Sequence, residues 1–414
     1  MSKSLRGGAW FQSLVIKLIL IALAVVPAIA LYRQRFPSRQ AEQTTFAVAE
    51  KSKPGPIPRV EPDPTEGAKL VGMQVCAGCH QDQQTALATS GHSRTFAHTS
   101  KSEIARSLDG QSFTDSVLNV TYQYHFHPEK GLSVAIPEHF AEDFPLQYAL
   151  GSGIHGMTFV GISNVKEGAV EPRNIALEHH VTVFPQSKQK LNLTPGHDGR
   201  EVRRKHSMFG APMEQGSVQL CFDCHTTNLK INDFALVDLQ ENVTCEKCHG
   251  PGSRHVEAAE RGEKSPRHLR LIPNTFTADQ QMRACGQCHR YPAPGTAIHR
   301  NDLGSLRFQP VGLMQSRCYL ESKGKLTCSS CHDPHAGTTH DSATYTAVCL
   351  KCHDKVKAES STCPISPATD CARCHMPAVK VVHDVPFTDH WIRIRNEEDP
   401  PAIDPIPLPE KSKK

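Results

Sequence analysis

Residues 328–353 read CSSCHDPHAGTTHDSATYTAVCLKCH, and this stretch contains the pattern CxxCH twice. The pattern occurs seven times in the whole chain. Each copy places two cysteines three positions apart and a histidine directly after the second cysteine. In chain order, motifs 1 to 7 are Cys76, Cys79 and His80; Cys221, Cys224 and His225; Cys245, Cys248 and His249; Cys285, Cys288 and His289; Cys328, Cys331 and His332; Cys349, Cys352 and His353; and Cys371, Cys374 and His375.

This spacing suits covalent haem attachment. Two thiols three residues apart can add to the two vinyl groups of one haem, and the adjacent histidine can bind the iron on one face. Zinc sites and disulfide frameworks also use many cysteines, but neither requires a histidine at the next position. The chain has 24 histidines in 414 residues, so a histidine would follow by chance about one time in 17. The pattern therefore predicts seven haem c groups, with the seven motif histidines as iron ligands.

The composition fits a fold that packs around its cofactors. Hydrophobic residues make up 38% of the chain and aromatic residues only 6%, so the side chains alone provide a thin core. Haem would add the missing apolar mass. The formal net charge is +4, but each oxidised haem with ionised propionates adds about −1. We therefore expect a mildly acidic holoprotein, and no nucleic acid among its partners.

The N-terminal residues 1–36 are predicted to be an export signal or a membrane anchor. An apolar run at 14–32 follows Lys3 and Arg6, which is the order of charge and apolar sequence in export signals. Small residues at 28–30 offer a cleavage site, yet the run is also long enough to span a bilayer. Both readings stay open. In either case we expect a periplasmic or otherwise extracytoplasmic body, with membrane association through 14–32 if the run is retained.

The rest of the chain is divided by its composition and its motifs. We predict a flexible tether at 37–66, a first haem site with a β-rich lobe at 67–216, six haem motifs at 217–395 and a disordered tail at 396–414. Apolar and polar residues alternate over 116–127 and 132–136, around the turn PEKG, which predicts a β-hairpin. A second strand-like pair covers 179–184 and 190–195. The predicted fold class is mainly α and irregular and haem-dominated, with this β-hairpin-rich insert between the first and second haem sites.

The second iron ligand of each haem is expected to be another histidine. A histidine that closely follows a motif is held on the proximal side of its own haem, so it would more readily bind a neighbouring haem. Such cross-ligation would force the haems close together. Methionine is a further type of axial ligand, but the supply of histidines favours two histidines on each iron. The candidate second ligands are His92, His155, His255, His335, His383 and His390.

Two cysteines lie outside the motifs, Cys318 and Cys363. Three readings are open: a disulfide, a thiolate bound to an iron, or two unrelated thiols. An exported protein favours oxidation of spare thiols, so the disulfide is the expected state.

Several of these elements resemble one protein family. VGMQVCAGCH with a downstream SGHSRTF, CEKCHGPGSRHV, the doubled CSSCHDPH and CLKCH, and CARCHMP followed by TDHWIR are similar to multihaem cytochromes of the cytochrome c-554 class. The resemblance covers roughly residues 70–395. It implies periplasmic electron transfer through closely packed haems, mostly with two histidine ligands. His92, His255, His335 and His390 stand in matching contexts.

Three functions are compatible with the sequence. The leading one is a carrier of single electrons between redox partner proteins, such as a membrane quinol-side donor or other cytochromes. The alternative is a reductase or oxidase of a small nitrogen or sulfur compound, which needs one iron with an open position. All seven motifs end in histidine, which favours the carrier, and no catalytic residue is predicted. The third is a structural unit of an extracellular haem filament.

Overall fold

The computed structural model describes residues 63–166, 171–198, 204–264, 267–270, 277–292, 298–353, 363, 365 and 369–404. All of them belong to one compact unit, Glu50–Lys414. The predicted export segment and most of the predicted tether lie outside the described residues. No helix within the described ranges combines the length and the apolar character needed to cross a membrane.

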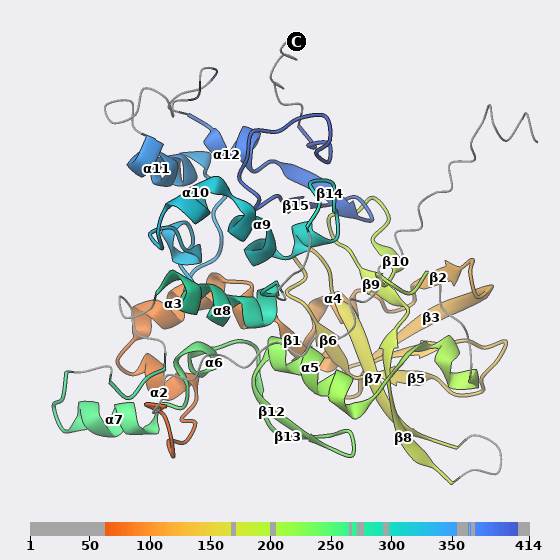
Figure 1. Ribbon diagram of the computed structural model, residues 1–414. Helices are drawn as coiled ribbons and strands as arrows, with labels where there is room; N and C mark the ends of the chain where they lie inside the picture. Colours follow the sequence, from red (N-terminus) through yellow and green to blue (C-terminus); the bar gives the residue numbers. More distant parts are fainter. Residues whose placement is uncertain are drawn as a thin grey trace, which may run out of the picture. The chain divides into compact units, whose positions relative to one another are not determined.

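The part of the chain between the first and second motifs in the sequence forms a β lobe (Figure 1). Both predicted strand pairs are confirmed: β3 pairs with β4 across the PEKG turn, and β9 pairs with β10. All pairings between the named strands are antiparallel. The strands of the lobe are β1 (Phe96–His98), β2 (Ser112–Asp115), β3 (Val120–His127), β4 (Gly131–Ala135), β5 (Phe144–Leu146), β6 (Tyr148–Leu150), β7 (Thr158–Val165), β8 (Arg173–His179), β9 (Val181–Val183), β10 (Leu191–Leu193) and β11 (Gly210–Met213).

The lobe contains two larger sheets with the strand orders β1-β6-β7-β8-β11 and β2-β3-β4-β5. Alternate residues of β3 point into the core, so Tyr122 and Tyr124 are fully buried there. Gly161 on β7 lets that strand approach β5, because a Cβ atom there would lie 2.1 Å from the Pro145 carbonyl oxygen. A second core joins the lobe to the motif 2 helix through Phe96 and Phe222, whose rings are 5.1 Å apart.

The motifs lie on short helical segments. Five helices, α5, α6, α8, α11 and α12, end at the histidine of their motif, while motif 5 begins a 3₁₀ turn. The α-helices are α2 (Met73–Ala77), α3 (Gln81–Thr89), α4 (Glu103–Arg106), α5 (Gln215–His225), α6 (Cys245–His249), α7 (Ser253–Glu260), α8 (Ala278–His289), α9 (Gln309–Gln315), α10 (Arg317–Glu321), α11 (Ser342–His353) and α12 (Cys371–His375). The 3₁₀ turns are η1 (His92–Arg94), η2 (Thr99–Lys101), η3 (Lys205–Met208), η4 (Ser305–Arg307) and η5 (Cys328–Ser330).

The predicted fold class, mainly α and irregular, is wrong: the fold is mixed, with helices and five antiparallel sheets in the described residues. Strands also occur in the motif-rich half, where helices were expected. β12 (Thr226–Asn232) and β13 (Ala235–Glu241) form a hairpin directly after motif 2, and β14 (Ala378–Val382) and β15 (Val385–Thr388) form another after motif 7. Their β-branched residues favour strands, and the CxxCH motifs use only a turn or two of helix each.

Candidate haem-binding sites

The motifs are brought together in space, and one buried carboxylate helps to join motifs 1 and 3. Glu246 lies between the two cysteines of motif 3 and is 5% exposed. Its carboxylate accepts hydrogen bonds from the backbone N–H groups of Val71 (2.9 Å), Gly72 (2.8 Å) and Gly252 (2.9 Å). Because α2 begins at Met73, this carboxylate fixes the start of the motif 1 helix against motif 3.

Cysteines of different motifs also lie next to each other. The thiols of Cys76 and Cys245 share a hydrogen bond, which lowers the pKa of Cys245 to about 7. Hydrogen bonds of the same kind, or electrostatic interactions between thiols, link further motifs. The linked pairs are Cys76 with Cys245, Cys248 with Cys285, Cys224 with Cys288, Cys285 with Cys328, Cys331 with Cys349, and Cys349 with Cys371. All seven motifs are therefore connected, with motif 4 next to motifs 2, 3 and 5.

Four motif histidines each face a histidine from a distant segment. The ring centroids of His80 and His255 are 6.3 Å apart, and those of His249 and His335 are 6.1 Å apart. The other two pairs have similar spacing: His92 with His289 at 6.1 Å, and His332 with His390 at 6.2 Å.

This spacing fits two imidazoles that bind one iron from opposite faces. Two metal–nitrogen bonds of about 2.0 Å, plus about 1.1 Å from each nitrogen to its ring centroid, give a separation of about 6.2 Å. Direct stacking of the rings would bring them closer: His155 lies 4.7 Å from the Phe387 ring. The four pairs therefore leave room for a metal between the rings, and the residues fit haem iron with two histidine ligands.

Three of the predicted ligand histidines, two of them outside the four pairs, have one ring nitrogen engaged by an acceptor. The Nδ1 atoms of His225, His375 and His390 lie 3.0, 3.0 and 2.9 Å from the backbone oxygens of Thr95, Arg393 and Thr388. When Nδ1 donates the proton, Nε2 keeps a lone pair for a metal. These contacts therefore fix the direction of the three rings and leave the Nε2 atom of each available to a metal.

Burial also favours the form of histidine that binds metals. Desolvation by burial lowers the pKa of His390 to about 4 and lowers the pKa of His92, His225 and His332 as well. A histidine must be neutral to donate a lone pair to iron. At neutral pH these side chains are therefore in the binding form.

Two candidate second ligands lie elsewhere. The His155 ring stacks on Phe387, with an angle of 22° between the planes. The Nε2 atom of His383 lies 2.8 Å from the Leu193 backbone oxygen, and its ring packs on Phe184. Neither is placed by these contacts opposite a motif histidine. His353 ends α11, beside motif 7.

The structure does not form the disulfide predicted between Cys318 and Cys363. Cys318 interacts electrostatically with Cys331 and Cys352, whereas Cys363 is near Cys374. The two spare thiols therefore lie beside different motif cysteines, and burial raises the pKa of Cys318.

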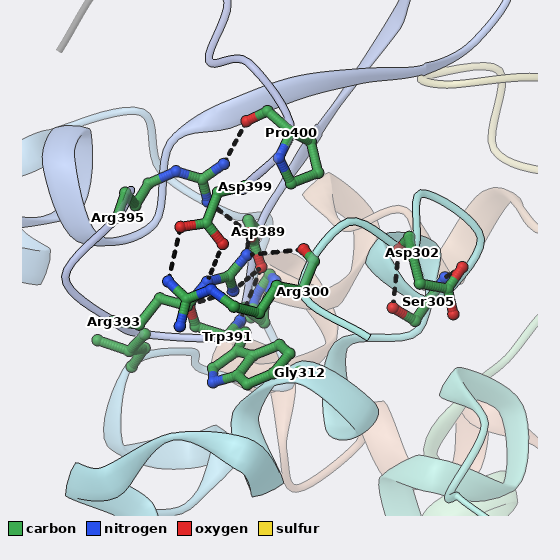
Figure 2. Close-up of polar contacts among 12 residues, drawn as sticks. Arg300, Asp302, Ser305, Gly312, Asp389, Trp391, Arg393, Arg395, Asp399 and Pro400 are labelled. Carbon is green, nitrogen blue, oxygen red and sulfur yellow. Dashed lines mark hydrogen bonds and ion pairs between the residues drawn. The ribbon is translucent and has the colours of Figure 1, made fainter. Parts of the chain in front are cut away.

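A buried cluster of ion pairs surrounds the segment that carries His390, and the sequence analysis missed it (Figure 2). Asp389 is fully buried and binds Arg393 at 2.9 Å and Arg395 at 2.7 Å. Asp399 binds Arg393 and Arg300, both at 2.7 Å. The alternating charges of DHWIRIR were the only signal in the sequence, and they do not reveal the partners at 300 and 399.

The same segment supports two motifs at once. His390 faces His332 of motif 5, and the backbone oxygen of Arg393 accepts the hydrogen bond from His375 of motif 7. Gly312 of α9 allows this segment to pack closely, since a Cβ atom there would lie 2.7 Å from the Trp391 backbone nitrogen. The ion pairs therefore hold a ligand candidate for one motif and a hydrogen-bond acceptor for another.

The CxxCH motifs and the comparisons with known proteins together identify the class of protein. The chain is a multihaem c-type cytochrome that binds haem c covalently. Residues 178–250 match the family described as cytochrome c554 and c-prime, and residues 322–358 match the doubled CXXCH motif. The multiheme cytochrome MtrA of Shewanella baltica (strain OS185) is 24% identical over 174 residues, which are 38% of this chain and 45% of that protein. The chain thus spans less than half the length of this relative. The crystal structure of outer cell wall cytochrome OcwA aligns with a TM-score of 0.44 at 17% identity, over 78% of this chain and 80% of that one.

Proposed function

We propose that this protein is an exported heptahaem cytochrome that transfers single electrons between redox partners through closely packed haems. The observation that carries the proposal is the set of four histidine pairs with ring centroids 6.1–6.3 Å apart. Haem c supplies a one-electron change at iron, and the chain fixes the distances and the ligands.

The ligand assignments follow from these pairs. The fourteen motif cysteines attach seven haems, and each motif histidine is the first iron ligand. We assign the second ligands of motifs 1, 3, 4 and 5 to His255, His335, His92 and His390, in that order. Each second ligand comes from a segment outside the motif whose iron it binds. The proposed iron sites therefore link separate segments of the chain.

The hydrogen bonds and electrostatic interactions between thiols support an order for the electron path. Motif 1 adjoins motif 3, which is followed by motifs 4, 5, 6 and 7. Motif 2 adjoins motif 4 and is assigned to a branch. The ends at motifs 1, 2 and 7 are then the places where electrons enter and leave.

The partners and the compartment are also proposals. The apolar run at 14–32, preceded by positive charge, supports an extracytoplasmic position. Other cytochromes, or a membrane donor on the quinol side, are suitable partners. A carrier of single electrons needs a donor that gives, and an acceptor that takes, one electron at a time.

Reversible electron storage tests the carrier function. The purified holoprotein should take up electrons from reduced methyl viologen and return them to ferricyanide, and it should not turn over nitrite, hydroxylamine or sulfite. Steady-state consumption of one of these compounds would overturn the carrier function in favour of a reductase.

The proposed path has its own test, the magnetic coupling between ferric irons in pulsed electron paramagnetic resonance. A variant with Cys221→Ala and Cys224→Ala lacks the haem of motif 2, and the couplings among the other irons should stay unchanged. A variant with Cys285→Ala and Cys288→Ala removes the junction, and the irons of motifs 2, 3 and 5 should each lose a coupling. Equal effects of the two variants would contradict the order.

A further inference from the structure

The segment from His332 to His335 contacts three of the proposed iron sites. His332 is the histidine of motif 5 and faces His390. The backbone of Pro334 hydrogen-bonds with His92, which faces His289 of motif 4. His335 faces His249 of motif 3, with an angle of 2° between the ring planes. This four-residue segment therefore supplies one histidine to the pair at motif 3, one to the pair at motif 5, and a backbone contact to the pair at motif 4.

Within this segment, Asp333 holds the ring of His335. Its Oδ1 atom accepts a hydrogen bond of 2.9 Å from the His335 backbone N–H and lies 3.2 Å from His335 Nδ1. These two contacts to a single oxygen close a tight turn and fix the direction of the imidazole. Because Nδ1 is engaged by the carboxylate, Nε2 is left for the iron that His249 shares.

The acceptor of His335 differs in charge from the acceptors of His390 and His92. His390 and His92 bond to backbone carbonyl groups, which are neutral. The Nδ1 atom of His255 is buried with no hydrogen-bond partner among the described residues. Of the four assigned second ligands, only His335 has a carboxylate on its ring nitrogen in the contacts that the described residues make.

We propose that Asp333 is a positioning residue for the iron of motif 3 and lowers its reduction potential through His335. This inference rests on the proposed function, because it needs His335 to be an iron ligand. A carboxylate that accepts the Nδ1 proton makes the imidazole a stronger electron donor, and this stabilises ferric iron relative to ferrous iron. The Asp333 side chain is 63% exposed, so solvent screens its direct field and the hydrogen bond carries the effect.

The test compares two variants that each lose one negative charge. Asp333→Asn keeps the size of the side chain and an oxygen that can accept both hydrogen bonds, so it changes the charge and little else. The matched control is Asp238→Asn, in the β12–β13 hairpin: Asp238 is 57% exposed, bonds Lys230 and touches no histidine in the contacts found for it. Redox titrations followed by optical and paramagnetic resonance spectra give the midpoint potentials.

The expected result is a rise in the potential of one low-spin iron in Asp333→Asn, with the other irons unchanged and no change at any iron in Asp238→Asn. His335→Ala tests the ligand assignment separately from the role of Asp333, because loss of this ligand should convert one iron to high spin. If His335→Ala does so and Asp333→Asn shifts no potential, the role of Asp333 is wrong and the ligand assignment stands. If His335→Ala leaves every iron low spin, the ligand assignment itself is wrong. Equal shifts in both aspartate variants would show a general charge effect and would also overturn the proposal.

Discussion

The imidazole rings of His80 and His255 lie nearly parallel, 6.3 Å apart at their centroids and inclined by 23°. His80 completes motif 1, whereas His255 lies on α7, just after motif 3. A metal held between them would tie together two segments that are far apart in the sequence. Haem attachment and folding are therefore expected to depend on each other in this chain.

Replacing His255 with alanine should change the spin state of one iron without changing the haem content. The iron of motif 1 would keep His80 and both thioether bonds but lose its second strong ligand, so it should become high spin. Paramagnetic resonance of the oxidised protein measures this change. His139→Ala is the control, because that exposed histidine has no assigned role. Identical spectra for the two variants would refute the assignment.

Replacing Asp389 with asparagine should strongly destabilise the holoprotein. The substitution leaves the buried guanidinium groups of Arg393 and Arg395 short of one negative charge, which costs about 3–5 kcal/mol in the free energy of unfolding. Asp384→Asn removes an exposed partner of Lys380 and should cost about 1 kcal/mol or less. Denaturant titration of both variants gives the comparison, and similar losses would show that the cluster does not stabilise the fold.

The β lobe should lose stability as the pH falls from about 6.5 to 4. Burial lowers the pKa of His180 to about 4 and that of His179 to about 3, from an ordinary value of 6.5. Between these pH values the two histidines are protonated in the unfolded chain but neutral in the folded lobe. The free energy of unfolding is therefore highest above pH 6.5 and falls on acidification. The loss from His180 alone is about 3 kcal/mol.

His180→Gln should reduce this pH dependence by about half, because glutamine does not titrate whereas His179 still does. The exposed residue His127 provides the control variant, His127→Gln, which should keep the slope of the parent. Unfolding of the lobe can be followed by the fluorescence of its tyrosines, of which Tyr122 and Tyr124 are buried. An unchanged slope in His180→Gln would mean that another group causes the acid sensitivity.

Alkylation of the denatured, unreduced holoprotein should label two thiols, Cys318 and Cys363. The structure forms no disulfide between them, and in the proposed holoprotein the motif cysteines are consumed by thioether bonds to haem. Mass spectrometry of the digested protein locates the labels. If neither residue were alkylated until a reductant is added, the two cysteines would form a disulfide in the protein, contrary to this prediction.

The parts of the fold that were predictable depend on local patterns. The CxxCH spacing predicts where haem attaches, and the alternation over 116–136 predicts the hairpin of β3 and β4, which is confirmed. The position of a histidine close behind a motif is also a local feature. It predicts that His255 and His335 bind neighbouring haems, and their ring centroids lie 6.3 and 6.1 Å from those of histidines in other motifs.

The parts that were not predictable depend on contacts between distant residues. Arg300 pairs with Asp399, and His92 faces His289, yet neither pairing leaves a trace in the spacing of the sequence. His383 shows the reverse case: it follows the last motif, but its ring nitrogen contacts the Leu193 carbonyl of β10 in the β lobe. The hairpins of the motif-rich half were missed because the abundance of CxxCH suggested helices alone.

The intact mass of the mature, denatured protein tests the central claim most directly, because thioether bonds survive denaturation and hold every attached haem. The account predicts the mass of the polypeptide plus seven haems, with no further haem released by acid extraction. A mass with fewer haems, or a polypeptide mass without haem and with bound zinc, would contradict it.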